Sequence, residues 1–149
     1  MSNELRQEAI RLLARREHTR TELARKLAGH GTPEEIELVL AEMEATQLQS
    51  DSRTAESWLR GNAARLGGSR LRHSLKSRGL APELIEAQIE QADLPDEMDR
   101  ARAIWSRKFS AAPSNAKEWA RQARFLQGRG FAGDVVRRLL KEPREEDAA

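Results

Sequence analysis

The stretch TRTELARKLAGHGTPEEIELVL, residues 19–40, contains the pattern that decides the fold. Leu23 and Leu27 stand four residues apart and therefore share one face of a helix. Gly31 follows in the same register, where a glycine can end a helix through a left-handed backbone conformation. A second apolar stripe begins at Ile36. The stretch therefore predicts two short helices joined by a tight turn.

The same cassette occurs twice more along the chain. Its positions are Leu71, Leu75, Gly79, Ile85 and Ile89 in the second copy, and Leu126, Gly130, Val136 and Leu140 in the third. From Gly31 onward, the three glycines are 48 and 51 residues apart. Repeats of this length usually form stacked units that share a surface. We therefore predict an all-α protein of three tandem three-helix (helix-turn-helix-like) repeats, stacked into an elongated curved molecule.

Local start signals place the helices within each repeat. Thr19 and Glu22 have the spacing of a capping box. Thr32 followed by Pro33 is typical of a helix start, and Asp51 is predicted to cap the first helix of the second repeat. The predicted boundaries are 1–48 for helical repeat 1, 49–95 for helical repeat 2, 96–143 for helical repeat 3 and 144–149 for an acidic flexible tail.

Composition agrees with slim helical bundles that expose much of their surface. Hydrophobic residues make up 38% and charged residues 34% of the 149 residues, and the mean hydropathy is −0.75. The absence of cysteine excludes disulfides and thiolate chemistry and fits a reducing compartment. No window approaches the roughly 18 apolar residues that a membrane span requires. We therefore expect a soluble, cytoplasmic protein that makes no membrane contact.

Positive charge is concentrated in two parts of the chain, although the net charge is only +2. Residues 53–78 hold seven basic residues against Glu56 alone, and residues 100–141 hold eleven against two acidic ones. Arginine clusters suit phosphate groups or an acidic protein face. The candidate partner or nucleic-acid contacts are Arg70, Arg72, Lys76, Arg78, Arg121, Arg124 and Arg129. The alternative is that these residues form solvated helix faces, with acidic side chains nearby in space.

At the repeated cassettes the chain resembles a known family. RREHTRTELARKL (15–27) is similar to the first-repeat signature of RecX, the bacterial regulator of the RecA recombinase. GGSRLR (67–72) followed by LKSRG (75–79) resembles the second repeat of that family, and RFLQGRGF (124–131) followed by DVV (134–136) resembles the third. The signatures occur in the right order and cover nearly the whole chain, which makes them more specific than a single helix-turn-helix match.

The resemblance implies a monomeric helical modulator, usually an inhibitor, of RecA filaments on single-stranded DNA. Such a protein would lie in the filament groove and limit filament growth, ATP hydrolysis, strand exchange and SOS co-protease activity, with direct DNA contact left open. One position departs from the family pattern. Asp51 and Arg53 are present, but Thr54 fills a place that is often aromatic. We expect this difference to weaken one core contact.

No residue pattern indicates catalysis, a cofactor or a metal site. The three histidines lack metal-ligand spacing, no serine or carboxylate has an evident histidine partner, and there is no phosphate-binding glycine-rich loop. The aromatic residues have helical spacing with apolar partners, which favours core packing over base stacking. They are Trp58, Trp105, Trp119, Phe125 and Phe131. We therefore predict that the protein is not an enzyme.

Two other functions remain open at this point. A DNA-binding helix-turn-helix protein acting alone would read base edges with polar and amide side chains. The candidate helices offer mostly arginine and lysine, with Gln122 and Gln127 only in the third repeat, which favours phosphate or protein contact. A purely structural adaptor is the second alternative.

Overall fold

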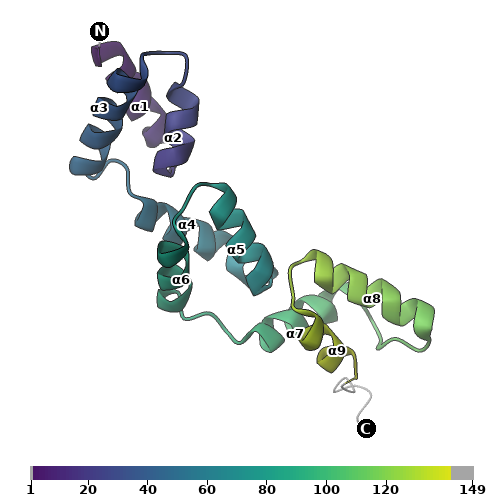
Figure 1. Cartoon of the computed structure of the whole chain (residues 1–149). Helices are drawn as coiled ribbons and strands as arrows, with labels where there is room; N and C mark the ends of the chain where they lie inside the picture. The colour runs from purple at the N-terminus through teal and green to yellow at the C-terminus, as the bar shows by residue number, and fades with distance from the viewer. Residues whose placement is uncertain (1, 142–149) are drawn as a thin grey trace. The chain divides into compact units, whose positions relative to one another are not determined.

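The structure, a computed structural model, describes residues 2–141, and all regular structure within them is helical (Figure 1). The prediction of an all-α chain with three tandem three-helix repeats is confirmed. The elements are α1 (Ser2–Arg15), α2 (Arg20–Leu27) and α3 (Pro33–Ala45) in the first repeat; α4 (Asp51–Asn62), a 3₁₀ turn η1 (Ala63–Arg65), α5 (Gly68–Ser77) and α6 (Pro82–Gln91) in the second; and α7 (Glu97–Lys108), α8 (Ala116–Gly128) and α9 (Gly133–Lys141) in the third. The elongated curved shape stays a prediction, and the predicted tail, 144–149, lies outside the described residues.

The two helix starts predicted in the first repeat are capping boxes in the structure. The hydroxyl of Thr19 accepts a hydrogen bond from the backbone N–H of Glu22 at 3.0 Å, and the Glu22 carboxylate accepts one from the Thr19 N–H at 2.9 Å. Thr32 and Glu35 make the same reciprocal pair, and Pro33 occupies the first turn of α3. These helices start where local chemistry satisfies their free backbone N–H groups.

The predicted cap of α4 is wrong by one residue. Ser50 caps the helix, because its hydroxyl accepts a hydrogen bond from the N–H of Arg53 at 3.1 Å. Asp51 is the first residue of α4, and its carboxylate accepts bonds from the backbone N–H of Arg20 at 2.8 Å and from the side chain of Gln49 at 2.9 Å. Asp51 therefore ties the start of α4 to the start of α2.

The left-handed glycine of the first repeat is Gly29, which corrects the expectation for Gly31. Gly29 has a φ of +86°, close to the +90° of Gly79 and the +89° of Gly130. The difference arises because α2 ends immediately after Leu27, so its closing turn comes two residues earlier than the leucine spacing indicates. Gly31 instead lies beside Leu5: a Cβ added to Gly31 would approach the Leu5 side chain to 3.0 Å.

The first and third repeats each have a hydrophobic core of their own. In the first repeat, apolar side chains from α1, α2 and α3 meet, with Leu23, Leu27 and Met43 fully buried. The core of the third repeat contains two of the aromatic residues expected to pack inside, Trp105 and Phe131, and Trp119 and Phe125 pack against it half-buried. The indole N–H of Trp105 donates to the side-chain oxygen of Gln122 at 2.6 Å. Hydrophobic stripes thus become cores at the predicted helix faces.

Packing divides the described chain into two compact units, and the second repeat contributes to both. One unit contains the chain up to Leu59 together with Ser74–Ala92, and the other contains Arg60–His73 together with the chain from Asp93 onward. Helix α5 therefore begins in the second unit and ends in the first. No helix within residues 2–141 combines the length and the apolar character that crossing a membrane requires.

Candidate functional site

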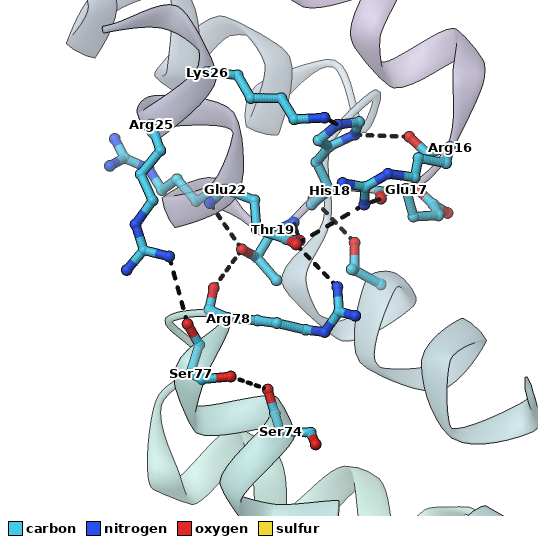
Figure 2. Close-up of polar contacts among 12 residues, drawn as sticks. Arg16, Glu17, His18, Thr19, Glu22, Arg25, Lys26, Ser74, Ser77 and Arg78 are labelled. Carbon is cyan, nitrogen blue, oxygen red and sulfur yellow. Dashed lines mark hydrogen bonds and ion pairs between the residues drawn. The ribbon is translucent and has the colours of Figure 1, made fainter. Parts of the chain in front are cut away.

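In the first unit, the start of α2 meets the closing turn of α5. The Thr19 hydroxyl donates to the carbonyl oxygen of Arg78 at 2.6 Å (Figure 2). The next residue, Gly79, is packed so closely that an added Cβ would lie 2.3 Å from the side chain of Thr21. Real Cβ atoms do not approach so closely, so the contact requires glycine for space as well as for its positive φ. We call this contact the first joint.

The loop before α2 is held from the other side by α4 and the residues before it. The carbonyl oxygen of His18 lies 3.0 Å from the Thr54 hydroxyl and 3.3 Å from the side-chain nitrogen of Gln49. The Thr54 hydroxyl is also 2.8 Å from the carbonyl of Ser50, so its single proton serves one of two acceptors. Thr54 is buried. Where an aromatic residue would supply apolar area, threonine supplies a hydrogen bond to the His18 loop.

The imidazole of His18 is almost completely buried beside two cations. Its Nδ1 lies 2.9 Å from the carbonyl oxygen of Arg16, and its Nε2 lies 3.1 Å from the Nζ of Lys26. Because an ammonium group only donates, Nε2 must be the acceptor and Nδ1 must carry the proton. Burial lowers the pKa of His18, and the charges of Arg16 and Lys26 lower it further against the opposing effects of the Arg16 carbonyl and Glu22. The ring is therefore neutral in the folded protein at neutral pH.

An open groove of about 620 Å³ runs beside the first joint. Its lining residues are Arg16, Glu17, Glu22, Thr54, Ser57, Trp58, Ser74, Ser77 and Arg78, several of which Figure 2 shows. The charged side chains in it are largely paired: Arg78 contacts Glu22 at 2.9 Å and also lies over the ring of Trp58, 5.8 Å from the ring centroid. Glu17 pairs with Arg53. The groove thus combines balanced charges with one indole.

In the second unit, the start of α5 meets the closing turn of α8 in the same manner. The backbone N–H of Gly67 donates to the carbonyl of Arg129 at 2.8 Å, and the guanidinium of Arg70 donates to the carbonyl of Gly128 at 2.7 Å. A Cβ added to Gly130 would lie 2.2 Å from the Cβ of Arg70. This second joint repeats the first one: a helix start from one repeat docks on the left-handed glycine turn of the next.

The seven predicted contact residues fall into three groups. Two of them are built into the joints: Arg70 bonds the α8 turn, and Arg78 is half-buried against Glu22. Arg72 is exposed and its guanidinium covers Gly68, while Lys76 is exposed and has no ion pair with any residue in the described part of the chain. The third group comprises Arg121 and Arg124 of α8 and Arg129, which caps the end of that helix.

Arg121 and Arg129 lie over two aromatic rings. Arg121 pairs with Glu118 at 2.9 Å and lies 5.2 Å from the ring centroid of Phe109. Arg129 lies 5.1 Å from the ring centroid of Phe125, which packs edge-on against Phe109. Arg124 is exposed. The structure therefore brings Arg121 and Arg129 to one aromatic pair, and it also brings Arg70 to the turn that contains Arg129.

Sequence reasoning missed several residues that shape these surfaces. Lys108, the last residue of α7, lies 5.6 Å from the centroid of the Phe125 ring. Thr21 and Glu22 contact a turn that is more than fifty residues away along the chain. The repeated spacing of Gly79 and Gly130 in the sequence indicates the two glycine turns. It does not indicate which helix start packs against each turn. Nowhere within residues 2–141 do three or more His, Cys, Asp or Glu side chains gather closely enough to hold a metal ion.

The fold and these open surfaces define a tandem helical-repeat protein, a class whose functional residues lie on exposed faces. Family models for the first, second and third three-helix domains of RecX match residues 6–43, 50–87 and 95–140. The chain belongs to the RecX family.

Curated relatives and solved structures agree with this assignment. The protein named "Regulatory protein RecX" from Leptothrix cholodnii is 44% identical over 92% of this chain and 87% of its own length. The protein of the same name from Herminiimonas arsenicoxydans is 40% identical over 96% of this chain and 95% of its own length. A crystal structure of RecX from Lactobacillus salivarius has the same fold, with a TM-score of 0.78 at 17% identity over 94% of both chains.

Proposed function

We propose that this protein regulates the RecA recombinase by binding the filament that RecA forms on single-stranded DNA. The proposal rests on one observation: relatives named as regulatory proteins align with 92% and 96% of the chain. From the family resemblance we take inhibition as the direction of regulation. The bound protein limits filament growth, ATP hydrolysis, strand exchange and SOS co-protease activity, and thereby acts in DNA repair and recombination in the cytoplasm.

The proposed mode of action is stoichiometric binding without turnover. Three repeats give one chain several small contact surfaces, and several weak contacts along one polymer reinforce each other through effective concentration. The groove beside the first joint and the surface of α8 carry charged and aromatic side chains suited to such contacts. We place the chain as a monomer in the groove of the RecA filament, where one molecule can touch neighbouring RecA subunits.

The basic residues named from the sequence stay our proposed contact surface, with unequal roles. Lys76 and Arg124 are exposed and make no ion pair within the described part of the chain, so their charges are available to a partner. The guanidinium groups of Arg70 and Arg78 already bond within the protein. Substituting them would therefore alter the joints as well as any contact with a partner.

The proposal is tested by the DNA-dependent ATPase of RecA. With RecA assembled on single-stranded DNA, we expect the purified protein to lower the ATPase rate at less than one copy per RecA subunit, because one chain that spans or caps the filament affects several subunits. Unchanged ATPase activity at equimolar protein, together with unchanged filament length in electron micrographs, would contradict the proposal.

The two rival functions give different results in a pull-down of RecA. A regulator of the filament should capture RecA much better when single-stranded DNA is present. A helix-turn-helix protein acting alone should instead prefer one duplex sequence over others, whether or not RecA is present. A structural adaptor should bind RecA equally well with and without DNA and should leave the ATPase rate unchanged.

A further inference from the structure

The outward surface of α8 carries a row of cations around one half-buried ring. Arg121, Phe125 and Arg129 are four residues apart and therefore share a helix face. Arg129 and Lys108 both lie over the ring of Phe125, at 5.1 and 5.6 Å from its centroid. Cations at these distances are attracted by the negative face of the ring. The ring thus holds two positive charges near one another at the surface.

These positive charges lack matching carboxylates. Of the cations in this group, Arg121 pairs with Glu118, whereas Lys108, Arg124 and Arg129 make no ion pair within residues 2–141. Residues 100–141 contain only two acidic residues, Glu118 and the exposed Asp134 on α9. An anion supplied from outside the chain would therefore relieve mutual repulsion among these cations.

Gly128 leaves bare backbone at the C-terminal end of α8, next to Arg129. It is exposed, and a Cβ added to it would have no heavy atom within 4 Å. It follows Arg124 by four residues and therefore lies beside it on α8, and its carbonyl oxygen accepts the hydrogen bond from Arg70. A glycine that no packing contact requires gives a ligand close access to the helix backbone.

We propose that Lys108, Arg121, Arg124 and Arg129, with Gly128 between them, form a binding site for the phosphodiester backbone of single-stranded nucleic acid. The row from Arg121 to Arg129 extends about 12 Å along the helix, which suits a chain of regularly spaced phosphates. The cations cover the ring faces on which a base would stack, so the site responds to charge and backbone and not to base identity. The inference deepens the proposed function, because it assigns nucleic acid as the partner of α8.

Direct binding of a labelled single strand tests the proposal without RecA. Fluorescence anisotropy with a thirty-nucleotide oligo-dT should show binding by the full-length protein that weakens steeply with salt. Replacing both Lys108 and Arg124 with glutamine should reduce the slope of log K against log salt concentration by about 1.4, at about 0.7 per phosphate contact on a single strand. Oligo-dA should bind within about threefold of oligo-dT.

Two substitutions of equal size at Gly128 distinguish the effect of charge on binding from the effect of size. Gly128→Glu places a carboxylate among the cations and should weaken binding at least about tenfold, whereas the isosteric Gly128→Gln should change it less than about threefold. Circular dichroism and melting temperature check that both variants fold. Equal binding by the two variants, no binding of free single strands, or equal competition by polyglutamate would overturn the inference. RecA inhibition that persists in any of these cases would leave the proposed function standing.

Discussion

The His18 loop shows how single residues combine two roles at a contact between repeats. The imidazole of His18 fixes the loop internally, while its carbonyl oxygen receives bonds from Gln49 and Thr54. The next residue, Thr19, caps α2 with the acceptor lone pairs of its hydroxyl and donates the hydroxyl proton to Arg78. A change in the charge of the ring therefore acts where the first and second repeats bond to each other.

We predict that acid weakens the folded state through His18. Burial lowers its pKa in the folded chain, whereas the unfolded chain has a pKa of about 6.5. Between these two pKa values the unfolded state binds more protons, so stability is complete above about pH 6.5 and falls as the pH decreases through this window. A protonated ring would face the positive charges of Arg16 and Lys26, which Glu22 offsets only in part.

Urea unfolding at pH 7.5 and pH 5.5 measures this effect. His18→Gln should be less stable than the unmodified protein at pH 7.5, because the buried ring is lost, but its stability should decrease less between the two pH values. An equal decrease in both proteins would show that His18 does not carry the pH dependence.

At the scale of elements, the three left-handed glycines differ in what surrounds them. Gly29, Gly79 and Gly130 all have a positive φ, which costs an L-residue roughly 1–2 kcal/mol. Gly79 and Gly130 also lie against a neighbouring helix start, whereas a Cβ on Gly29 would meet nothing within 4 Å. A side chain at Gly79 or Gly130 would therefore meet both backbone strain and a steric clash, whereas a side chain at Gly29 would meet backbone strain alone.

This difference predicts unequal effects of one substitution. Gly29→Ala should lower the free energy of unfolding by about 1–2 kcal/mol, the cost of strain alone. Gly79→Ala should cost clearly more, because its Cβ would lie 2.3 Å from Thr21 and the first joint would have to open. Urea midpoints of the two variants provide the comparison, and similar midpoints would mean that the joint contributes little to stability.

Helix starts could be predicted from sequence because their determinants are local. Thr19 and Thr32 each cap a helix through residues within three positions. The pattern points to Asp51 as a cap although Ser50, an equally good cap, precedes it. It points to Gly31 in place of Gly29 because leucine spacing does not show where α2 ends. The joints could not be predicted, because Thr19 and Arg78 are 59 residues apart and no local sequence pattern links one to the other.

At the scale of the whole molecule, substitutions of exposed basic residues should affect activity, whereas substitutions of basic residues in the joints should also affect stability. Lys76 and Arg124 make no ion pair among the described residues, so replacing both with alanine should weaken inhibition of the RecA ATPase. The melting temperature should hardly change, because exposed charges contribute little to stability. Full inhibition by the double variant would mean that these two residues do not contact the partner and are simply solvated.

Arg78→Ala is the control with the opposite expectation. This side chain is ion-paired with Glu22 and covers the ring of Trp58, so its removal should lower the melting temperature through lost packing as well as lost charge. A loss of inhibition in this variant would follow from a damaged joint. The comparison therefore shows whether a basic residue acts on a partner or within the fold.

Each joint joins a helix start of one repeat to a glycine turn of the next repeat. This order determines where a further repeat could be inserted. The first repeat supplies a helix start, the third supplies a glycine turn, and the second supplies both, through Gly67 at one end of α5 and Gly79 at the other. Within residues 2–141, only the second repeat takes part in both joints. A gene duplication that inserted another copy of it in tandem would create a new joint from parts already present, which makes the middle repeat the natural unit of elongation in evolution or in design.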